Sequence, residues 1–172
     1  MVIPREAGRI TYSAEIRNLK KRLVLDDRQG AVVIGGILGD GNLSPNWSNT
    51  NYRLSIGQSI KQKDYVMWKY DILKEWILSE PRYYEKAQSL SFRTISHPLL
   101  TDLYYKFYRN GKKVIPENIK DLLTPEVIAI WFMDDGNIRR NNEKDYGYYL
   151  NTQSFSEEEN RYLSQSLQER YG

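Results

Sequence analysis

The chain has no cysteine, only one histidine and only six prolines among its 172 residues. The lack of cysteine excludes disulfide bonds, thiolate zinc sites and cysteine nucleophiles. The one histidine, His97, stands directly before a proline, and we interpret it as a surface residue at the start of a helix rather than as a base. Cysteine and histidine chemistry therefore offer no starting point for this protein.

Long hydrophobic runs are also missing. No apolar stretch approaches the roughly 18 residues that cross a bilayer. The N-terminal residues 1–6 lack the apolar core of a secretory signal. We therefore expect an intracellular protein without a membrane partner.

Charge is present in both signs, with a formal net charge of only +3. Hydrophobic content of 40% and charged content of 27% are typical of a soluble globular protein. The basic excess lies in residues 1–30 and 51–125, mixed with many of the 14 tyrosines, whereas residues 126–172 are net acidic. A basic, aromatic-rich surface is typical of nucleic-acid binding, but an ordinary solvated surface explains the charge equally well.

Two short tracts, Val33–Gly41 and Ile128–Gly136, organise the chain. Each is an apolar run that ends in an acid, then glycine, then asparagine, and the two stand 95 residues apart. At the same offset Gln58 is matched by Gln153. A repeat of such long period indicates one module used twice.

The first tract is apolar on every face, so periodicity alone leaves a buried strand or a buried helix open. Gly35 and Gly39 lie four residues apart, on one face of a helix, where they would let another backbone approach closely. In a strand, glycines would only weaken the structure. We predict a helix, and a second one opened by the cap signal Thr124-Pro125-Glu126.

The remaining elements follow from periodicity and turn signals. We predict a short N-terminal helix over residues 13–25, two amphipathic helices over 63–78 and 98–108, and a final helix over 156–171. We also predict a strand in each repeat, over 52–60 and 146–153, a hairpin over 82–95 and a linker over 110–116. The expected organisation is a basic extension over residues 1–30, a first repeat over 31–123 and a second over 124–172. Because the second copy stops after helix, two strands and helix, we expect it to lack its last two strands and helix, as in a C-terminally truncated form.

Asp40 and Asp135 end the two predicted helices. The last turn of a helix carries unpaired carbonyls and a partial negative charge, so a carboxylate there is unfavourable unless a cation offsets it. A carboxylate with carbonyl oxygens such as that of Gly39 suits Mg²⁺, which can activate water and neutralise charge in a displacement at phosphorus. The alternative is that Asp-Gly is simply a turn. Its repetition on matched apolar helices favours the metal site.

With these tracts the chain resembles the LAGLIDADG homing endonucleases, in particular the monomeric two-motif branch of the omega-intron type. The resemblance rests on the two nine-residue tracts and extends from about residue 31 to the end. It includes the segments Lys112-Lys113-Val-Ile-Pro, Trp131-Phe-Met-Asp-Asp-Gly136 and Leu150-Asn-Thr-Gln-Ser-Phe155. Ile130 departs from the family pattern, which has glycine there, and we expect Ala129 to provide the close helix contact instead.

The resemblance implies an α+β fold of tandem αββαββα repeats around a pseudo-twofold axis. Two curved sheets would form a saddle in the major groove of double-stranded DNA, and Mg²⁺-dependent cleavage would cut both strands. The full-length form would act as a monomer, whereas a truncated chain could associate with another molecule. No small-molecule substrate is implied, and an organelle-encoded or a bacterial protein fits equally well.

The resemblance also implies a set of site residues. Asp40 and Asp135 would be the catalytic metal ligands, and Lys113 a catalytic basic residue that stabilises charge or orients water. We expect Gly39 and Asp134 at the metal as well, with Asp134 interpreted mainly as a capping or supporting group and only alternatively as a direct ligand. The residues expected to contact DNA are Arg53, Ser55, Arg82, Arg93, Arg139 and Arg140.

Two functions remain open at this stage. The first is a site-specific, metal-dependent DNA endonuclease associated with intron homing. The second is a nucleic-acid binder that does not cleave, such as an intron RNA maturase or a degenerate DNA-binding relative. Retention of Asp40, Asp135 and Lys113 favours the enzyme, because a binder gains nothing from two carboxylates that face phosphates.

Overall fold

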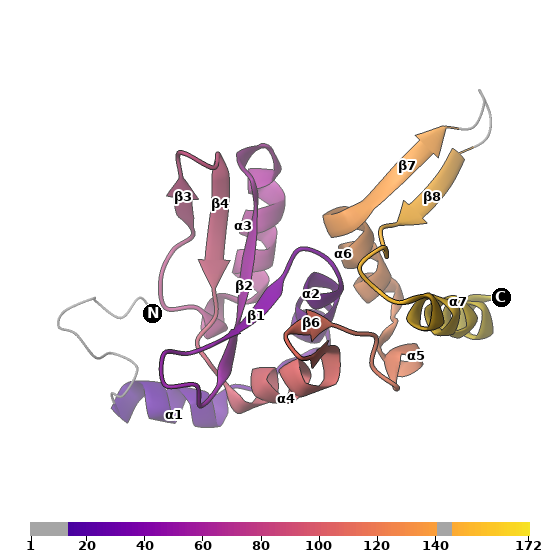
Figure 1. Ribbon diagram of the computed structural model, residues 1–172. Helices are drawn as coiled ribbons and strands as arrows, with labels where there is room; N and C mark the ends of the chain where they lie inside the picture. The colour runs from indigo at the N-terminus through magenta and orange to yellow at the C-terminus, as the bar shows by residue number, and fades with distance from the viewer. Residues whose placement is uncertain (1–13, 141–145) are drawn as a thin grey trace.

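The computed structural model of the protein describes residues 14–140 and 146–172 (Figure 1). Helices and antiparallel strands both occur, as the α+β prediction requires. The helices are α1 (Ala14–Arg22), α2 (Asp27–Leu38), α3 (Lys63–Ile72), α4 (Pro98–Phe107), α5 (Ile119–Leu122), α6 (Pro125–Asp135) and α7 (Glu157–Tyr171), with 3-10 turns η2 (Ile60–Gln62) and η3 (Lys74–Trp76). The strands are β1 (Asn42–Pro45), β2 (Tyr52–Ser59), β3 (Arg82–Tyr84), β4 (Ser89–Arg93), β5 (Tyr108–Arg109), β6 (Lys112–Lys113), β7 (Gly136–Arg140) and β8 (Tyr146–Leu150).

Helices α2 and α6 pack against each other at the centre of the molecule (Figure 1). Asp26 caps α2 by accepting a hydrogen bond from the Gln29 backbone N–H, and the predicted cap Thr124 accepts one from the Val127 N–H. A Cβ added at Gly35 would lie 2.8 Å from the Ile130 Cβ, so glycine is what lets the two helices approach. The helix prediction for the first tract is thus confirmed.

The expected role of Ala129 in this contact is wrong. Ala129 is exposed, whereas Ile130 is buried and lies directly against Gly35. The large residue and the glycine face each other across the interface, so one helix supplies the volume that the other leaves free. Glycine on one of the two helices is sufficient for close packing.

Strands β1, β2, β4 and β3 form one antiparallel sheet in that order. Its inner face carries Leu43, Leu54, Ile56, Leu90 and Phe92, all buried against the helices. The alternate residues point outward, because successive side chains of a strand face opposite sides. The sheet therefore has one apolar face on the core and one open polar face.

After α6 the chain forms the β7–β8 hairpin, on the other side of the helix pair from the four-stranded sheet (Figure 1). Helix α7 then packs beside α5 and is tied to it at its far end, where the Tyr171 hydroxyl donates to the Leu123 carbonyl. Its N-terminus is closed by a capping box of Ser156 and Glu159.

Three predicted elements differ in detail. The helix predicted over residues 63–78 is α3 followed by the 3-10 turn η3. The predicted linker over 110–116 contains the short β5–β6 hairpin. His97 does begin helix α4, but it is buried rather than at the surface, with its Nε2 2.8 Å from the Lys20 carbonyl oxygen on α1.

Among the described residues, none of the helices combines the length and the hydropathy that crossing a bilayer demands.

Candidate active site

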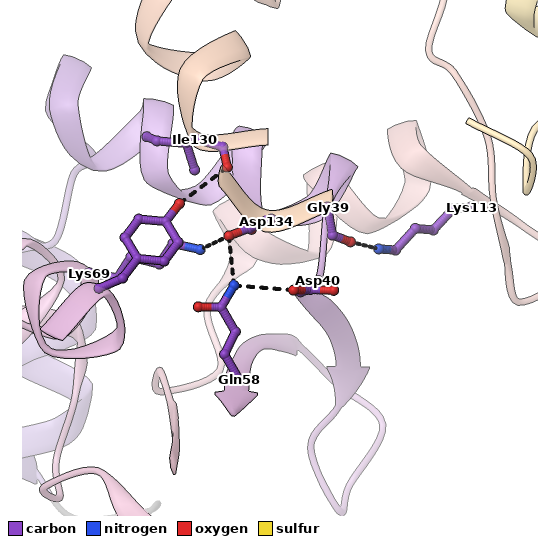
Figure 2. A network of polar contacts seen from close by, with 8 residues as sticks. Gly39, Asp40, Gln58, Lys69, Lys113, Ile130 and Asp134 are labelled. Atoms are coloured by element: carbon purple, nitrogen blue, oxygen red, sulfur yellow. Dashed lines mark hydrogen bonds and ion pairs between the residues drawn. The ribbon is translucent and has the colours of Figure 1, made fainter. Parts of the chain in front are cut away.

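Asp40 and the pair Asp134-Asp135 lie together at the adjoining C-terminal ends of α2 and α6. The Gln58 side-chain amide reaches both helices, donating to Asp40 Oδ2 at 3.1 Å and to Asp134 Oδ1 at 2.9 Å (Figure 2). The end of α2 is closed by a hydrogen bond from the Gly41 N–H to the Gly36 carbonyl at 2.6 Å, which turns the chain and exposes Asp40. The packing of two helices thus brings together acids that stand 95 residues apart.

Each of the two terminal acids accepts a hydrogen bond from a side-chain amide of its own repeat, Asp40 from one on β2 and Asp135 from one directly after β8. Gln58 serves Asp40, and the Asn151 side chain donates to Asp135 Oδ1 at 3.3 Å. The sequence repeat matched Gln58 with Gln153, but Gln153 lies in an exposed turn beyond β8. The hairpin register does not account for this difference. Asn42 pairs with Ser55 and Asn137 with Tyr149, a shift of one residue from the 95-residue offset, and that shift would match Gln58 with Thr152 rather than with Asn151.

The β5–β6 hairpin positions Lys113. Asn110 and Gly111 both have positive φ, 51° and 77°, as a two-residue type I′ hairpin turn requires. The Lys113 ammonium donates to the Gly39 carbonyl at 2.6 Å, at the point where α2 ends (Figure 2). Burial lowers the pKa of Lys113, and the charges of Asp40, Asp135 and Asp134 oppose that shift. One lysine thus lies within electrostatic reach of all three acids.

Asp134 is held differently from its neighbours. Its carboxylate forms an ion pair with Lys69 of α3, and both side chains are completely inaccessible to solvent. Burial raises the pKa of Asp134 and lowers that of Lys69, and the attraction between the two charges opposes both shifts. This arrangement favours the interpretation of Asp134 as a supporting group over that of a direct metal ligand.

The site provides carboxylates for a metal ion but no closed cage. Within residues 14–140 and 146–172, no three metal-ligating side chains gather closely enough to hold an ion by themselves. Mg²⁺ is commonly bound through one or two carboxylates together with waters and substrate phosphates. Asp40 and Asp135 fit that pattern, because among the described residues the carboxylate of each accepts one hydrogen bond, from a side-chain amide. The Gly39 carbonyl, already bonded to Lys113, retains one lone pair.

Four of the six residues predicted to contact DNA lie on the open face of the four-stranded sheet. The register pairs Ser55 with Arg93 across β2 and β4, and Arg82 with Ser91 across β3 and β4. Arg53 belongs to the same face, and its buried Nε has no hydrogen-bond partner in the described part of the chain. Burial and the neighbouring charge of Arg93 lower the pKa of Arg53. Two guanidinium groups side by side suit an anionic partner.

Arg139 and Arg140 do not share a face. They are consecutive residues of β7, so their side chains point to opposite sides of the hairpin. Arg140 lies over the Tyr146 ring, and on that side Tyr148 contacts Phe132 of α6. Arg139 therefore lies with Asn137 on the side of the hairpin that faces away from α6. Only one of the two arginines can contact DNA bound to that side.

Sequence reasoning did not assign four residues of this site: Gln58, Tyr65, Lys69 and Asn151. Tyr65 and Lys69 lie on one face of the amphipathic helix α3, which the periodicity placed correctly. A lysine on the buried face of a helix was the available signal, because a fully buried lysine needs an anionic partner.

The fold and the site together define an α+β protein in which two acid-tipped helices meet beside a basic, open sheet. The chain belongs to the LAGLIDADG DNA endonuclease family, whose model matches residues 30–172. The resemblance predicted from the two tracts is thereby confirmed at the level of the family.

Individual relatives agree with this assignment. The chain resembles the solved structure of the homing endonuclease I-WcaI bound to its DNA recognition sequence, with a TM-score of 0.81, 27% identity, and coverage of 97% of this chain and 77% of that one. It is 31% identical over 163 residues to a probable intron-encoded endonuclease of Wickerhamomyces canadensis, covering 88% of this chain and 70% of that protein.

A second group of relatives is formed by RecA proteins. The chain is 40% identical over 114 residues to protein RecA of Mycolicibacterium chitae, covering 65% of this chain and 26% of that protein. It spans between 18% and 32% of the length of the RecA proteins that it matches. The matched region is thus a small part of each of those proteins.

Proposed function

We propose that the protein is a site-specific homing endonuclease that hydrolyses both strands of a long DNA target with a divalent metal. The observation that carries the proposal is the meeting of Asp40 and Asp135 at the ends of two packed helices, within electrostatic reach of Lys113. In the two-motif monomeric branch, α2–α4 belong to the first αββαββα repeat and α6–α7 to the second, around a pseudo-twofold axis. One chain then supplies both acids.

Asp40 and Asp135 are the residues that would hold Mg²⁺, with the Gly39 carbonyl as a further oxygen ligand. When bound between them and the DNA phosphates, the metal would lower the pKa of water and neutralise charge at phosphorus. Gln58 and Asn151 orient the two carboxylates, so each presents its remaining oxygen outward. Asp134, paired with Lys69, supports the site from the interior.

Lys113 contributes positive charge at the phosphate that reacts. Its hydrogen bond to Gly39 fixes the ammonium beside the acids, where it would stabilise the charge that develops on the phosphoryl oxygens. Hydrolysis adds water to phosphorus and breaks one phosphorus–oxygen bond, and the departing oxygen takes up a proton. The partial burial of Lys113 strengthens its electrostatic contacts.

The open sheet face would bind the major groove of double-stranded DNA through Arg53, Ser55, Arg82 and Arg93, with Arg139 from the β7–β8 hairpin. Arginines on such strands hold phosphates or read guanine edges. Small residues lie between them on this face, Ser89, Ser91 and Gly57, and Tyr84 lies at its β3 edge. Similarity to an intron-encoded endonuclease and to RecA proteins supports a gene carried within a host gene, in an organelle or in bacteria.

A selection experiment tests the proposal. The chain is incubated with a randomised duplex library and Mg²⁺, and newly formed ends are ligated to adaptors and sequenced. We expect double-strand ends in one sequence context from the parent, and at least a 100-fold loss with Asp40→Asn or Asp135→Asn. Asp71→Asn, which removes an exposed acid of α3, is the matched control and should cut normally.

Replacing Mg²⁺ by Ca²⁺ separates binding from cutting, and binding without ends is expected. Tight, sequence-specific binding that never yields ends, with Asp40→Asn binding equally well, would instead identify a nucleic-acid binder that does not cleave. Cutting by both Asp→Asn variants at the parental rate would refute the assigned catalytic residues.

A further inference from the structure

A buried ion pair connects the two repeats directly behind the candidate active site. Lys69 lies on α3 of the first repeat and Asp134 near the end of α6 in the second, and neither side chain is accessible to solvent (Figure 2). The Tyr65 ring lies 4.2 Å from the Lys69 ammonium, and its hydroxyl donates to the Ile130 carbonyl at 3.2 Å. The lysine is thus enclosed by α3 on one side and α6 on the other.

The ion pair continues to Asp40 through one glutamine. The Gln58 amide donates to Asp134 Oδ1 and to Asp40 Oδ2, at 2.9 and 3.1 Å. Lys69, Asp134, Gln58 and Asp40 therefore form one continuous chain of polar contacts (Figure 2). Because each donor or acceptor is fixed by the one before it, the position of the Asp40 carboxylate depends on the position of Asp134.

The network is one-sided. Asp134 stands 95 residues after Gly39, at the equivalent place in the repeat, and a Cβ at Gly39 would lie 2.4 Å from the Asp134 Cβ. Only one of the two equivalent positions can carry a side chain, so only one acid can be reached through such a chain. On the other side, within the described part of the chain, the Asp135 carboxylate accepts a hydrogen bond from Asn151 and is not tied to an ion pair.

Stability does not explain this arrangement. Replacing a buried ion pair by apolar residues of similar size is often neutral or stabilising, because desolvating two charges offsets their attraction. The pair could be exchanged for hydrophobic packing in a core where α2, α3 and α6 already meet. A role in fixing the geometry of the adjoining carboxylate accounts for its charges.

We propose that Lys69 is a positioning residue that acts through Asp134 and Gln58 to fix Asp40, and so governs the DNA-strand cut served by Asp40. The inference rests on the proposed endonuclease function. The two DNA strands then differ in what their cleavage requires. Cleavage by the site of Asp40 depends on the contact between the repeats, whereas cleavage by the site of Asp135 does not.

Strand-specific rates test the proposal on an end-labelled duplex that carries the selected target. Lys69→Met should slow the Asp40 strand about 10- to 100-fold, the range expected when support of a metal ligand is lost, and slow the other strand far less. On supercoiled DNA the product should then accumulate as nicked circles. Lys74→Met, which removes an exposed lysine of η3, is the matched control and should keep the parental strand ratio.

Lys69→Met leaves the Asp134 charge unpaired and could unfold the protein, so a second variant is included. This double variant, Lys69→Met with Asp134→Leu, removes both charges and should fold with parental stability. It should still cut the Asp40 strand more slowly than the other strand, as Lys69→Met does. Gln58→Met alone should also slow cleavage of the Asp40 strand selectively. Adding Lys69→Met to it should slow that strand no further, because both residues act through one chain of contacts. Equal slowing of both strands, or additive effects, would overturn the proposal.

A readout without cleavage separates this inference from the proposed function. In NMR spectra of the free protein, the Gln58 side-chain amide and the Asp40 carboxyl carbon should shift in Lys69→Met with Asp134→Leu, but not in Lys74→Met. The Asp135 carboxyl carbon should stay in place. If the parent cuts no DNA, the proposed function fails while these shifts still decide the positioning role; unchanged Asp40 and Gln58 signals would refute it.

Discussion

Asp40 and Asp135 hold equivalent places in the repeat, but their surroundings are not equivalent. Asp40 contacts a glutamine that is anchored by the Lys69–Asp134 pair, whereas Asp135 contacts an asparagine at the end of β8. Lys113 lies on the β5–β6 hairpin of the first repeat, where it donates to the Gly39 carbonyl next to Asp40. A side chain's chemistry is thus set by what the fold places against it, and equivalent residues acquire different partners.

Glu159 shows the same dependence on surroundings and makes stability sensitive to pH. Burial alone would raise its pKa, but hydrogen bonds from the Ser156 and Ile115 backbone N–H groups hold the pKa below its usual value of 4.5. A carboxylate with a depressed pKa contributes stability above its ordinary pKa, and that contribution is lost as the pH falls through the folded value.

We therefore predict that Glu159→Gln lowers the free energy of unfolding by about 1 kcal/mol at pH 7, the usual contribution of a helix cap. The difference from the parent should shrink below about pH 4.5. Urea titrations at several pH values measure it, with the exposed Glu158→Gln as the control. A difference that stays constant down to pH 3 would contradict the assigned cause.

At the scale of elements, the interface between α2 and α6 is what creates the site. Its closeness depends on Gly35, where a Cβ would lie 2.8 Å from the Ile130 Cβ and 2.9 Å from the Val127 carbonyl oxygen. The backbone oxygen cannot rotate away as a flexible side chain could. Any separation of the helices also separates Asp40 from Asp135.

We predict that Gly35→Ala lowers the free energy of unfolding by about 1–3 kcal/mol through overpacking, and slows cleavage further because the acids move apart. Gly30→Ala, in the first turn of the same helix with nothing within 4 Å of the added Cβ, should be neutral or stabilise by about 0.5–1 kcal/mol. Thermal unfolding compares the two variants. Equal stability of both would show that the helices adjust without cost.

At the scale of the whole molecule, the open sheet and the β7–β8 hairpin lie on opposite sides of the helix pair (Figure 1). Arg53, Arg82 and Arg93 lie on the open face of the sheet, and Arg139 on the open side of the hairpin. The formal net charge is only +3, so the DNA affinity that we propose would come from the placement of charge rather than from its total.

We predict that DNA affinity, measured with Ca²⁺ in place of Mg²⁺, falls steeply with salt. Arg139→Ala should weaken binding and reduce the slope of log affinity against log salt by about 1. Arg140→Ala, on the opposite side of the same strand, should leave the slope unchanged. Fluorescence anisotropy over a salt series gives both slopes, and equal effects of the two arginines would contradict the assigned faces.

The sequence by itself determined which elements form, although not all of their ends. The cap signal at Thr124, the apolar tracts and the alternation of β2 are local patterns, and each produced the expected structure. The Asn-Gly pair at residues 110–111 is an equally local signal. We predicted a linker there, but the pair forms the turn of the hairpin that positions Lys113. The family, too, could be identified from the two tracts, because their spacing is a property of the chain alone.

Only the tertiary structure decided which side chains meet. Gln58 donates to Asp40, whereas its repeat partner Gln153 contacts neither acid within the described residues. Ile130 rather than Ala129 packs on Gly35, and Lys69 pairs with Asp134. These contacts join residues that lie far apart in the chain, and they depend on strand register and on how closely two helices cross. A shift of one residue in a strand turns a side chain to the other face, so no local pattern could fix them.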